Sequence, residues 1–136
     1  MDLPLDECMA LNGLPFGASR IEVRAFVGGE AQRFRRSVVG PEGDHWPEFG
    51  IFAYYNDAEQ LEALEMSKPA KVYFFGTDLI SLSLCKAKQV LSSVDETMED
   101  EGNAGISKKW GVGVWTGSGE HGQVQAVIRF ANGYYD

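Results

Sequence analysis

Two histidines, His45 and His121, are the side chains of this sequence most suited to exchange protons near neutral pH. Each follows an acidic residue, Asp44 or Glu120, but adjacent side chains rarely point in the same direction. Both lie in segments whose composition predicts loops, and neither has a serine or cysteine beside it that it could activate as a nucleophile. We therefore expect no catalytic residues and a chain that is not an enzyme.

The other residues that could bind a metal or a phosphate are also scattered. Cys8 and Cys85 stand far from each other and from both histidines, whereas a metal site needs several ligands at short spacing. The acidic run at 95–101 lacks the Asp-x-Asp-x-Asp-Gly pattern of a calcium loop. The paired glycines within 111–119 do not open a helix after a strand, as a phosphate loop would. We expect no metal and no cofactor, and we interpret both cysteines as reduced, small apolar residues of the core.

Net charge limits the partners. The 136 residues carry 20 acids and 12 bases, a net charge of −8. This charge disfavours nucleic acids and anionic membranes, because both are bound through clustered lysine and arginine. It favours solubility and attraction to a basic protein. The start of the chain, residues 1–7, has neither the basic nor the apolar region of a secretory signal, so we expect a cytoplasmic location.

Two acidic stretches and two tryptophans remain as candidates for partner binding. Residues 42–65 hold seven acids without a lysine or arginine, and residues 95–101 add five more. Such stretches speed the docking of a basic protein, and exposed tryptophans are favoured anchors of interfaces. Solvated loops would explain each stretch equally well, and Trp115 could instead pack under a helix or the chain end. The candidate contacts are Asp95, Glu96, Glu99, Asp100, Glu101, Trp46 and Trp115.

Two helices are predicted. Ser19 and Glu22 have the spacing of a capping box at the start of a helix over 19–27, which Gly28 and Gly29 end. A second helix, capped by Thr77 or Asp78, is indicated by an apolar stripe at three- and four-residue spacing. That stripe consists of Ile80, Leu84, Ala87, Leu91 and Val94, with Lys86 and Lys88 off it.

The remaining segments predict strands. Alternation or β-branched and aromatic residues indicate strands at 31–39, 49–55, 60–66, 72–75, 110–115 and 124–130. Residues 60–66 also fit a helix, but Pro69 leaves it little room, so we favour a strand. Residues 40–48 predict a loop, and Arg33, Arg35 and Arg36 should pair with nearby carboxylates. Trp115 should lie opposite the core face of its strand, and the last strand should bury Val124, Ala126, Ile128 and Phe130.

Short connections predict antiparallel pairing of these strands. The fold class expected is therefore α+β, a curved antiparallel sheet with two helices packed on one face. At this length the chain should form a single domain over 1–136, and no internal repeat is evident in the residues.

Two resemblances follow from these residues. The segment Gly17-Ala18-Ser19…Val23…Val27-Gly28 resembles the opening helix of the BamE-type and β-lactamase-inhibitor-protein-like family, whose modules place helical hairpins on antiparallel sheets and bind proteins. The wider order is similar to that of small acidic immunity proteins of bacterial secreted-toxin systems. It runs from Leu14-Pro15-Phe16-Gly17 through Phe75-Gly76-x-Asp78-Leu79 and Trp110-Gly-Val-Gly-Val to Gly133-Tyr134-Tyr135-Asp136. That resemblance implies a protein that blocks a cognate toxin in the cytoplasm without catalysis.

The leading hypothesis is a non-enzymatic protein-binding domain, an immunity protein that neutralises a basic toxin by occlusion. A second hypothesis is a small-ligand carrier or enzyme with a pocket between sheet and helices lined by Tyr54, Tyr73 and Trp110. A third is a structural or regulatory subunit that self-associates through an edge strand at 124–130. Monomer and homodimer both remain open.

Overall fold

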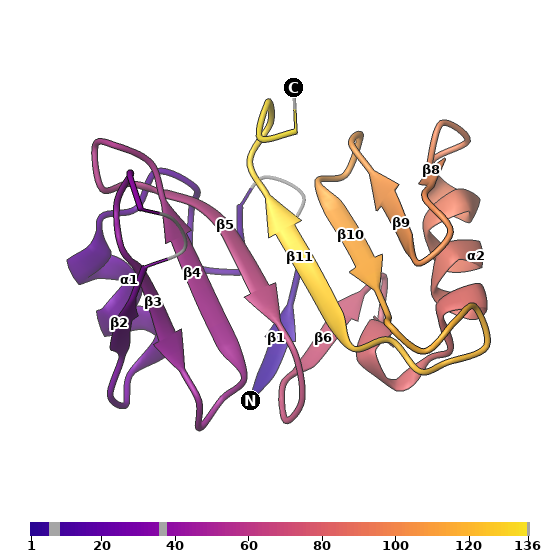
Figure 1. Cartoon of the computed structure of the whole chain (residues 1–136), viewed down its shortest axis with the longest axis horizontal. Helices are drawn as coiled ribbons and strands as arrows, with labels where there is room; N and C mark the ends of the chain where they lie inside the picture. The colour runs from indigo at the N-terminus through magenta and orange to yellow at the C-terminus, as the bar shows by residue number, and fades with distance from the viewer. Residues whose placement is uncertain (6–8, 36–37, 136) are drawn as a thin grey trace.

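The computed structural model describes residues 1–5, 9–35 and 38–135. These residues form a large antiparallel sheet of eight strands, in the order β2-β3-β4-β5-β11-β10-β9-β8, which Figure 1 shows side by side. The predicted α+β class with a curved antiparallel sheet is confirmed. The strands are β2 (Gln32–Phe34), β3 (Gly43–Trp46), β4 (Ile51–Tyr55), β5 (Leu61–Met66), β8 (Glu99–Asp100), β9 (Ala104–Ser107), β10 (Val112–Trp115) and β11 (Ala126–Phe130).

A second layer covers one face of this sheet. Both helices belong to it, α1 (Arg20–Val27) toward one end and α2 (Leu84–Val94) toward the other (Figure 1). Between them lies a small three-stranded sheet of order β1-β6-β7, in which β1 runs parallel to β6. The elements of this small sheet are β1 (Asp2–Pro4), β6 (Lys71–Phe74) and β7 (Thr77–Asp78), followed by the 3-10 turn η1 (Leu79–Ser81).

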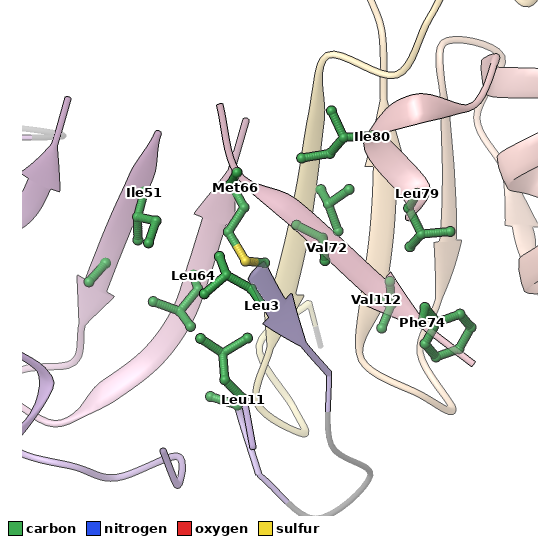
Figure 2. Packing of buried hydrophobic residues seen from close by; sticks show 14 of the residues in the cluster. Leu3, Leu11, Ile51, Leu64, Met66, Val72, Phe74, Leu79, Ile80 and Val112 are labelled. Carbon is green, nitrogen blue, oxygen red and sulfur yellow. The ribbon is translucent and has the colours of Figure 1, made fainter. Parts of the chain in front are cut away.

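The core fills the space between the two layers. Figure 2 shows Leu3 of β1 beside Leu64 and Met66 of β5, and Val72 of β6 close to the strands of the large sheet. These side chains are almost fully buried, and each buried aliphatic side chain stabilises the fold by about 1.5–3 kcal/mol relative to an exposed one. On the opposite face of the large sheet, which we call the open face, the described residues form no helix.

The first helix starts as predicted, and the second starts later. Ser19 accepts a hydrogen bond from the amide of Glu22, whose side chain accepts one from the amide of Ser19, so the capping box is confirmed. Asp78 caps the 3-10 turn instead of α2, and Ser83 is the cap of α2. Residues 79–81 therefore form a turn, and Leu82 and Ser83 an extended link, before α2 begins at Leu84.

The two halves of the chain repeat one topology. In the first half α1 is followed by the meander β2-β3-β4-β5, and in the second α2 is followed by β8-β9-β10-β11. The two meanders join through the antiparallel pair β5 and β11, which places a pseudo-twofold axis between these central strands. The residues show no repeat, so the duplication is visible only in the arrangement of the elements.

The pairing register is also repeated. Ile51 pairs with Met66 in the first half, and Val112 pairs with Arg129 at the same place in the second. The hairpin turns match as well: Gly50 and Gly111 have φ of 69° and 67°, and each donates its amide to the carbonyl four residues earlier. A Cβ at either glycine would collide with a backbone carbonyl of the neighbouring strand, so both turns require glycine.

The prediction of a strand at 60–66 is confirmed by β5. The predictions of a loop at 40–48 and of the position of the last strand are partly or wholly wrong. Residues 43–46 form β3 and not a loop, because their partners β2 and β4 supply the pairing. In β11, Val127 and Arg129 face the covered side, whereas Ala126 and Ile128 lie on the open side. Val124 and Phe130, in contrast, are buried as predicted. Strand β11 also lies between β5 and β10, so it is not an edge available for self-association.

The predictions for the arginine cluster, the cysteines and Lys88 are also only partly confirmed. Arg33 and Arg35 pair with Glu42 at 3.8 and 3.1 Å, as predicted, while Arg36 lies outside the described residues. Cys85 is a free, half-buried thiol on α2, and Cys8 lies outside the described residues. Lys88 was expected off the buried stripe of α2 but is only 5% exposed.

Candidate functional site

The open face of the large sheet is crossed by one row of paired residues. Residues directly opposite each other on neighbouring strands present their side chains on the same face. The row therefore contains one residue from each of the eight strands of the sheet. It runs Gln32, His45, Phe52, Glu65, Ile128, Gly113, Ile106 and Glu99.

In the first half an aromatic cluster fills this face. The His45 ring stacks on Phe52 with centroids 3.9 Å apart, and Phe34 meets Phe52 and Tyr54 edge to face at 5.4 and 5.7 Å. The hydroxyl of Tyr54 donates to the carboxylate of Glu65 at 3.3 Å. His45, a possible proton carrier by residue type, is thus engaged in packing, and the described residues bring no nucleophile to it.

In the second half the same face is hollow. A depression of about 410 Å³ lies over β9, β10 and β11, with Ile106 and Ile128 on its sides. Gly113 lies between these two isoleucines in the row, and a Cβ on it would come within 2.9 Å of the Ile128 Cγ2 atom. Gly113 is buried beneath Ile128 and adds no side chain to the floor of the depression. We call this depression the hollow; Glu65, Ala104, Val114, Trp115, Ala126 and Tyr135 complete its lining.

Trp115 stands on this open face as predicted, and 42% of it is exposed. Its cross-strand neighbours are Ala104 and Ala126, which are too small to cover an indole ring. Tyr54 holds the matching place in the first half, where Phe34 packs against it. Trp115 is therefore an aromatic ring available to a partner.

Trp46 is placed differently from the prediction. It lies in β3 on the covered side of the sheet and is only 1% exposed. The prediction that it sits in an exposed loop is wrong, because residues 43–46 pair with β2 and β4, and only Pro47 and Glu48 belong to the turn that follows β3. The ring is therefore not presented to a partner in this structure.

The acids of 95–101 are divided between the core and the surface. Asp95 is buried and accepts hydrogen bonds from Ser107 at 2.7 Å and from the hydroxyl of Thr97 at 2.6 Å. Burial raises the pKa of Asp95, but these hydrogen bonds outweigh it and leave the pKa below its ordinary value. Asp95 thus stabilises the turn after α2 and is not accessible to a partner.

The other acids of this segment are exposed. Asp100 accepts a hydrogen bond of 2.7 Å from the buried ammonium of Lys88, which holds the pKa of Asp100 below its usual value. Glu99 lies at the edge of the open face, 3.6 Å from the ammonium of Lys108. Glu96 and Glu101 are exposed on either side of β8. The edge strand next to the hollow is therefore acidic.

The acids of 42–65 are largely used within the fold. Asp44 is fully buried and accepts hydrogen bonds from Arg20 at 2.9 Å, from Arg24 at 2.6 Å and from the Tyr55 hydroxyl at 2.8 Å. Burial raises the pKa of Asp44, but Arg24, Tyr55 and Arg20 together bring it below its ordinary value. Burial and the Asp44 carboxylate raise the pKa of Tyr55. This cluster was not predicted, because its arginines come from α1, far away in the sequence.

The pocket expected from Tyr54, Tyr73 and Trp110 does not form as one site. Tyr73 and Trp110 line a cleft of about 350 Å³ on the layer opposite the open face, together with Phe75. Tyr54 lines a different, smaller depression near Gly43. Phe75 has a φ of 49°, a left-handed conformation that is uncommon for a bulky residue, and its ring meets Trp110 edge to face.

The described residues form neither a metal site nor a membrane-crossing helix. Within 1–5, 9–35 and 38–135, no three His, Cys, Asp or Glu side chains come together as a metal site would need. Neither helix in these ranges is long and apolar enough to cross a membrane. His121 is exposed in the loop that precedes β11.

Comparison with known proteins adds no relative: no family model, no curated protein and no solved structure matches this chain. We therefore infer the function from the open face, the hollow and the charges around them.

Proposed function

We propose that this chain is a non-enzymatic, cytoplasmic protein-binding domain, an immunity protein that neutralises a basic toxin by covering it. The observation that supports this proposal most directly is Trp115, an exposed indole beside an apolar hollow on a sheet face that neither α1 nor α2 covers. Tryptophans that are partly exposed on such faces dominate the binding energy of many interfaces.

The charges favour a basic partner. The net charge is −8, and Glu99 and Glu101 on the edge of the sheet extend this negative potential next to the hollow. Asp95 and Trp46 are buried, so they are left out of the proposed contact. Asp100 already accepts a hydrogen bond from the Lys88 ammonium, so we do not count it among the main contacts. The proposed mechanism is electrostatic steering of a basic protein to this edge, followed by burial of Trp115.

The test uses a partner captured by the tagged chain from its native host, then identified and purified. We expect the association rate of that partner to fall by roughly tenfold from low to high salt, as for other steered complexes. The Glu99→Gln/Glu101→Gln chain should associate several-fold more slowly at low salt than the chain with Glu48→Gln and Asp57→Asn, a control that removes the same charge from exposed loops elsewhere.

Trp115→Ala should weaken the complex by about thirtyfold through faster dissociation, because an interface anchor contributes about 2 kcal/mol or more. A complex whose association ignores salt and both acid pairs, and whose affinity ignores Trp115, would contradict the proposal. So would the failure to obtain any protein partner from the host.

A small-ligand function remains a second candidate because of the cleft lined by Tyr73, Phe75 and Trp110. Its volume of about 350 Å³ is within the range of small-molecule sites. Trp110 donates its indole N–H to the carbonyl of Val94, so a ligand would meet the face of the ring and not its polar edge. A thermal-shift screen with flat apolar compounds, compared between the original chain and Phe75→Ala, would distinguish this candidate.

A further inference from the structure

The shape of the hollow defines the size and polarity of its occupant. Its sides are the aliphatic groups of Ile106 and Ile128, and Gly113, buried between them, adds no side chain to its floor. The volume of about 410 Å³ accommodates one large side chain but is small for a helix or a strand. An occupant with an extended aliphatic part would contact both isoleucines.

The lining of the hollow contains a carboxylate and no cation. Glu65 lines it from β5, and its orientation is fixed by the hydroxyl of Tyr54 at 3.3 Å. Glu99 ends the same row of paired residues on the far side of Ile106. No Lys, Arg or His is among the described residues that line the hollow. A cationic occupant would therefore meet opposite charge at one end of the hollow and near the other.

Trp115 selects among cations. A guanidinium group stacks on the face of a tryptophan ring and is less strongly hydrated than an ammonium group. The exposed ring of Trp115 borders the hollow that Glu65 also lines. An aliphatic stem, a flat cation and a bidentate partner for a carboxylate are all properties of arginine.

We propose that the hollow formed by Ile106, Gly113, Ile128, Trp115 and Glu65 receives an arginine side chain of the protein partner. This inference rests on the proposed function, because it names the partner chemistry that the open face recognises. The arginine stem packs between the two isoleucines while its guanidinium group lies against Trp115 and pairs with Glu65.

The first test uses the chain alone with a short probe, N-acetyl-arginine amide, and its neutral isostere N-acetyl-citrulline amide. Amide and indole NMR signals of Gly113 and Trp115 should shift with the arginine probe and identify the hollow. The citrulline probe should bind about fivefold more weakly, the effect of one solvent-exposed charge pair. No shift in the hollow, or equal binding of both probes, would overturn the inference.

Two variants make the test specific. Glu65→Gln keeps an oxygen that accepts from Tyr54 and should reduce arginine binding to the citrulline level, whereas Glu48→Gln, which removes the same charge from an exposed turn, should not. Gly113→Ala should abolish the shifts, because its Cβ, 2.9 Å from the Cγ2 atom of Ile128, pushes that side chain into the hollow. Arginine binding unchanged in Glu65→Gln would overturn the pairing.

Affinity measurements with the purified partner distinguish a failure of this inference from a failure of the proposed function. With the purified partner, Glu65→Gln should weaken affinity about tenfold, as expected for one partly desolvated charge pair. If Trp115→Ala weakens the complex while Glu65→Gln and Gly113→Ala do not, the arginine inference is wrong and the protein-binding proposal stands. If the probe binds but the host yields no protein partner, the proposed function fails, and with it the assignment of the arginine to a partner.

Discussion

The two halves of this molecule share one topology and differ in what they do with it. Phe52 and Gly113 hold matching places on the open face of the sheet, as the register of their strands shows. The ring of Phe52 closes the first half by stacking on His45, whereas Gly113 leaves the hollow open in the second. In the first half, therefore, side chains on the open face pack against one another. In the second half, this face is hollow and open to solvent.

The helix charges differ in a corresponding way. Arg24 of α1 and Lys88 of α2 follow their capping serines by the same number of residues. Arg24 pairs with Asp44, which is fully buried, while Lys88 pairs with Asp100, whose side chain is 55% exposed. The stem of Lys88 lies against Gly105, which holds the place of Asp44 in the second half. In this matching ion pair, the scaffold buries the carboxylate, Asp44, in one half and the cation, Lys88, in the other.

The largest expected effect comes from breaking these two ion pairs. Asp44→Asn leaves Arg20 and Arg24 without their carboxylate and should lower the free energy of unfolding by about 3–5 kcal/mol. Asp100→Asn removes an exposed partner and leaves Lys88 with the Gly102 carbonyl and Glu120, so the loss of stability should be much smaller. Urea denaturation of both variants measures the difference. Similar losses in the two variants would show that the halves do not differ in this respect.

Low pH should produce part of the loss of folding stability that is expected for Asp44→Asn. The pKa of Asp44 is lowered in the folded state, so its stabilisation is complete above the unfolded pKa of about 4 and is lost as pH falls through the folded value. We expect the free energy of unfolding to fall more steeply below about pH 4 in the original chain than in Asp44→Asn. Denaturation curves at several acidic pH values test this, and parallel profiles would contradict it.

The open faces should respond differently to substitution. Phe52→Ala removes a half-buried ring that stacks on His45 and meets Phe34, and should destabilise the fold by about 1–2 kcal/mol. Gly113→Ala should change stability by about 1 kcal/mol or less, because Ile128 can turn into the open hollow. Thermal unfolding of the two variants measures this contrast, and a larger loss in Gly113→Ala would show that the hollow is structurally required.

The smallest expected difference concerns the helix caps. Ser19→Ala and Ser83→Ala should each cost about 1 kcal/mol, since each serine accepts from an amide in the first turn of its helix. Ser19→Ala should cost a few tenths more, because Glu22 completes a capping box only at α1. Hydrogen exchange of the Glu22 and Lys86 amides reports each cap. Equal protection losses would indicate that the capping box adds nothing.

Short-range patterns in the sequence were sufficient for several elements. The capping box of Ser19 and Glu22 and the alternation in 51–55 depend on residues close in the chain, and both are confirmed. The place of Trp115 opposite the buried Val112 and Val114 follows from the same two-residue alternation. The last strand was assigned to the wrong face, because it is apolar on both sides and buries Arg129, whose guanidinium donates to the carbonyls of Trp110 and Met9.

The candidate site could be predicted only in part. Trp115 and the acids Glu99 and Glu101 were identified from residue type, and the structure places them at one end of the open face. Trp46 and Asp95 were identified by the same reasoning but are buried, since composition does not reveal which loop residues pair with a neighbouring strand. The hollow was not predicted, because a glycine in a strand predicts close packing as readily as an open space.

The sequence by itself determined the acidic charge, the helix caps and the alternation of the strands, because each of these is a property of a few neighbouring residues. Only the tertiary structure decided which sheet face stays open, that Asp44 is buried between two arginines, and that Gly113 leaves a hollow beside Trp115 and Glu65. These features depend on strands and helices that lie far apart in the chain and meet only when the two halves join at β5 and β11.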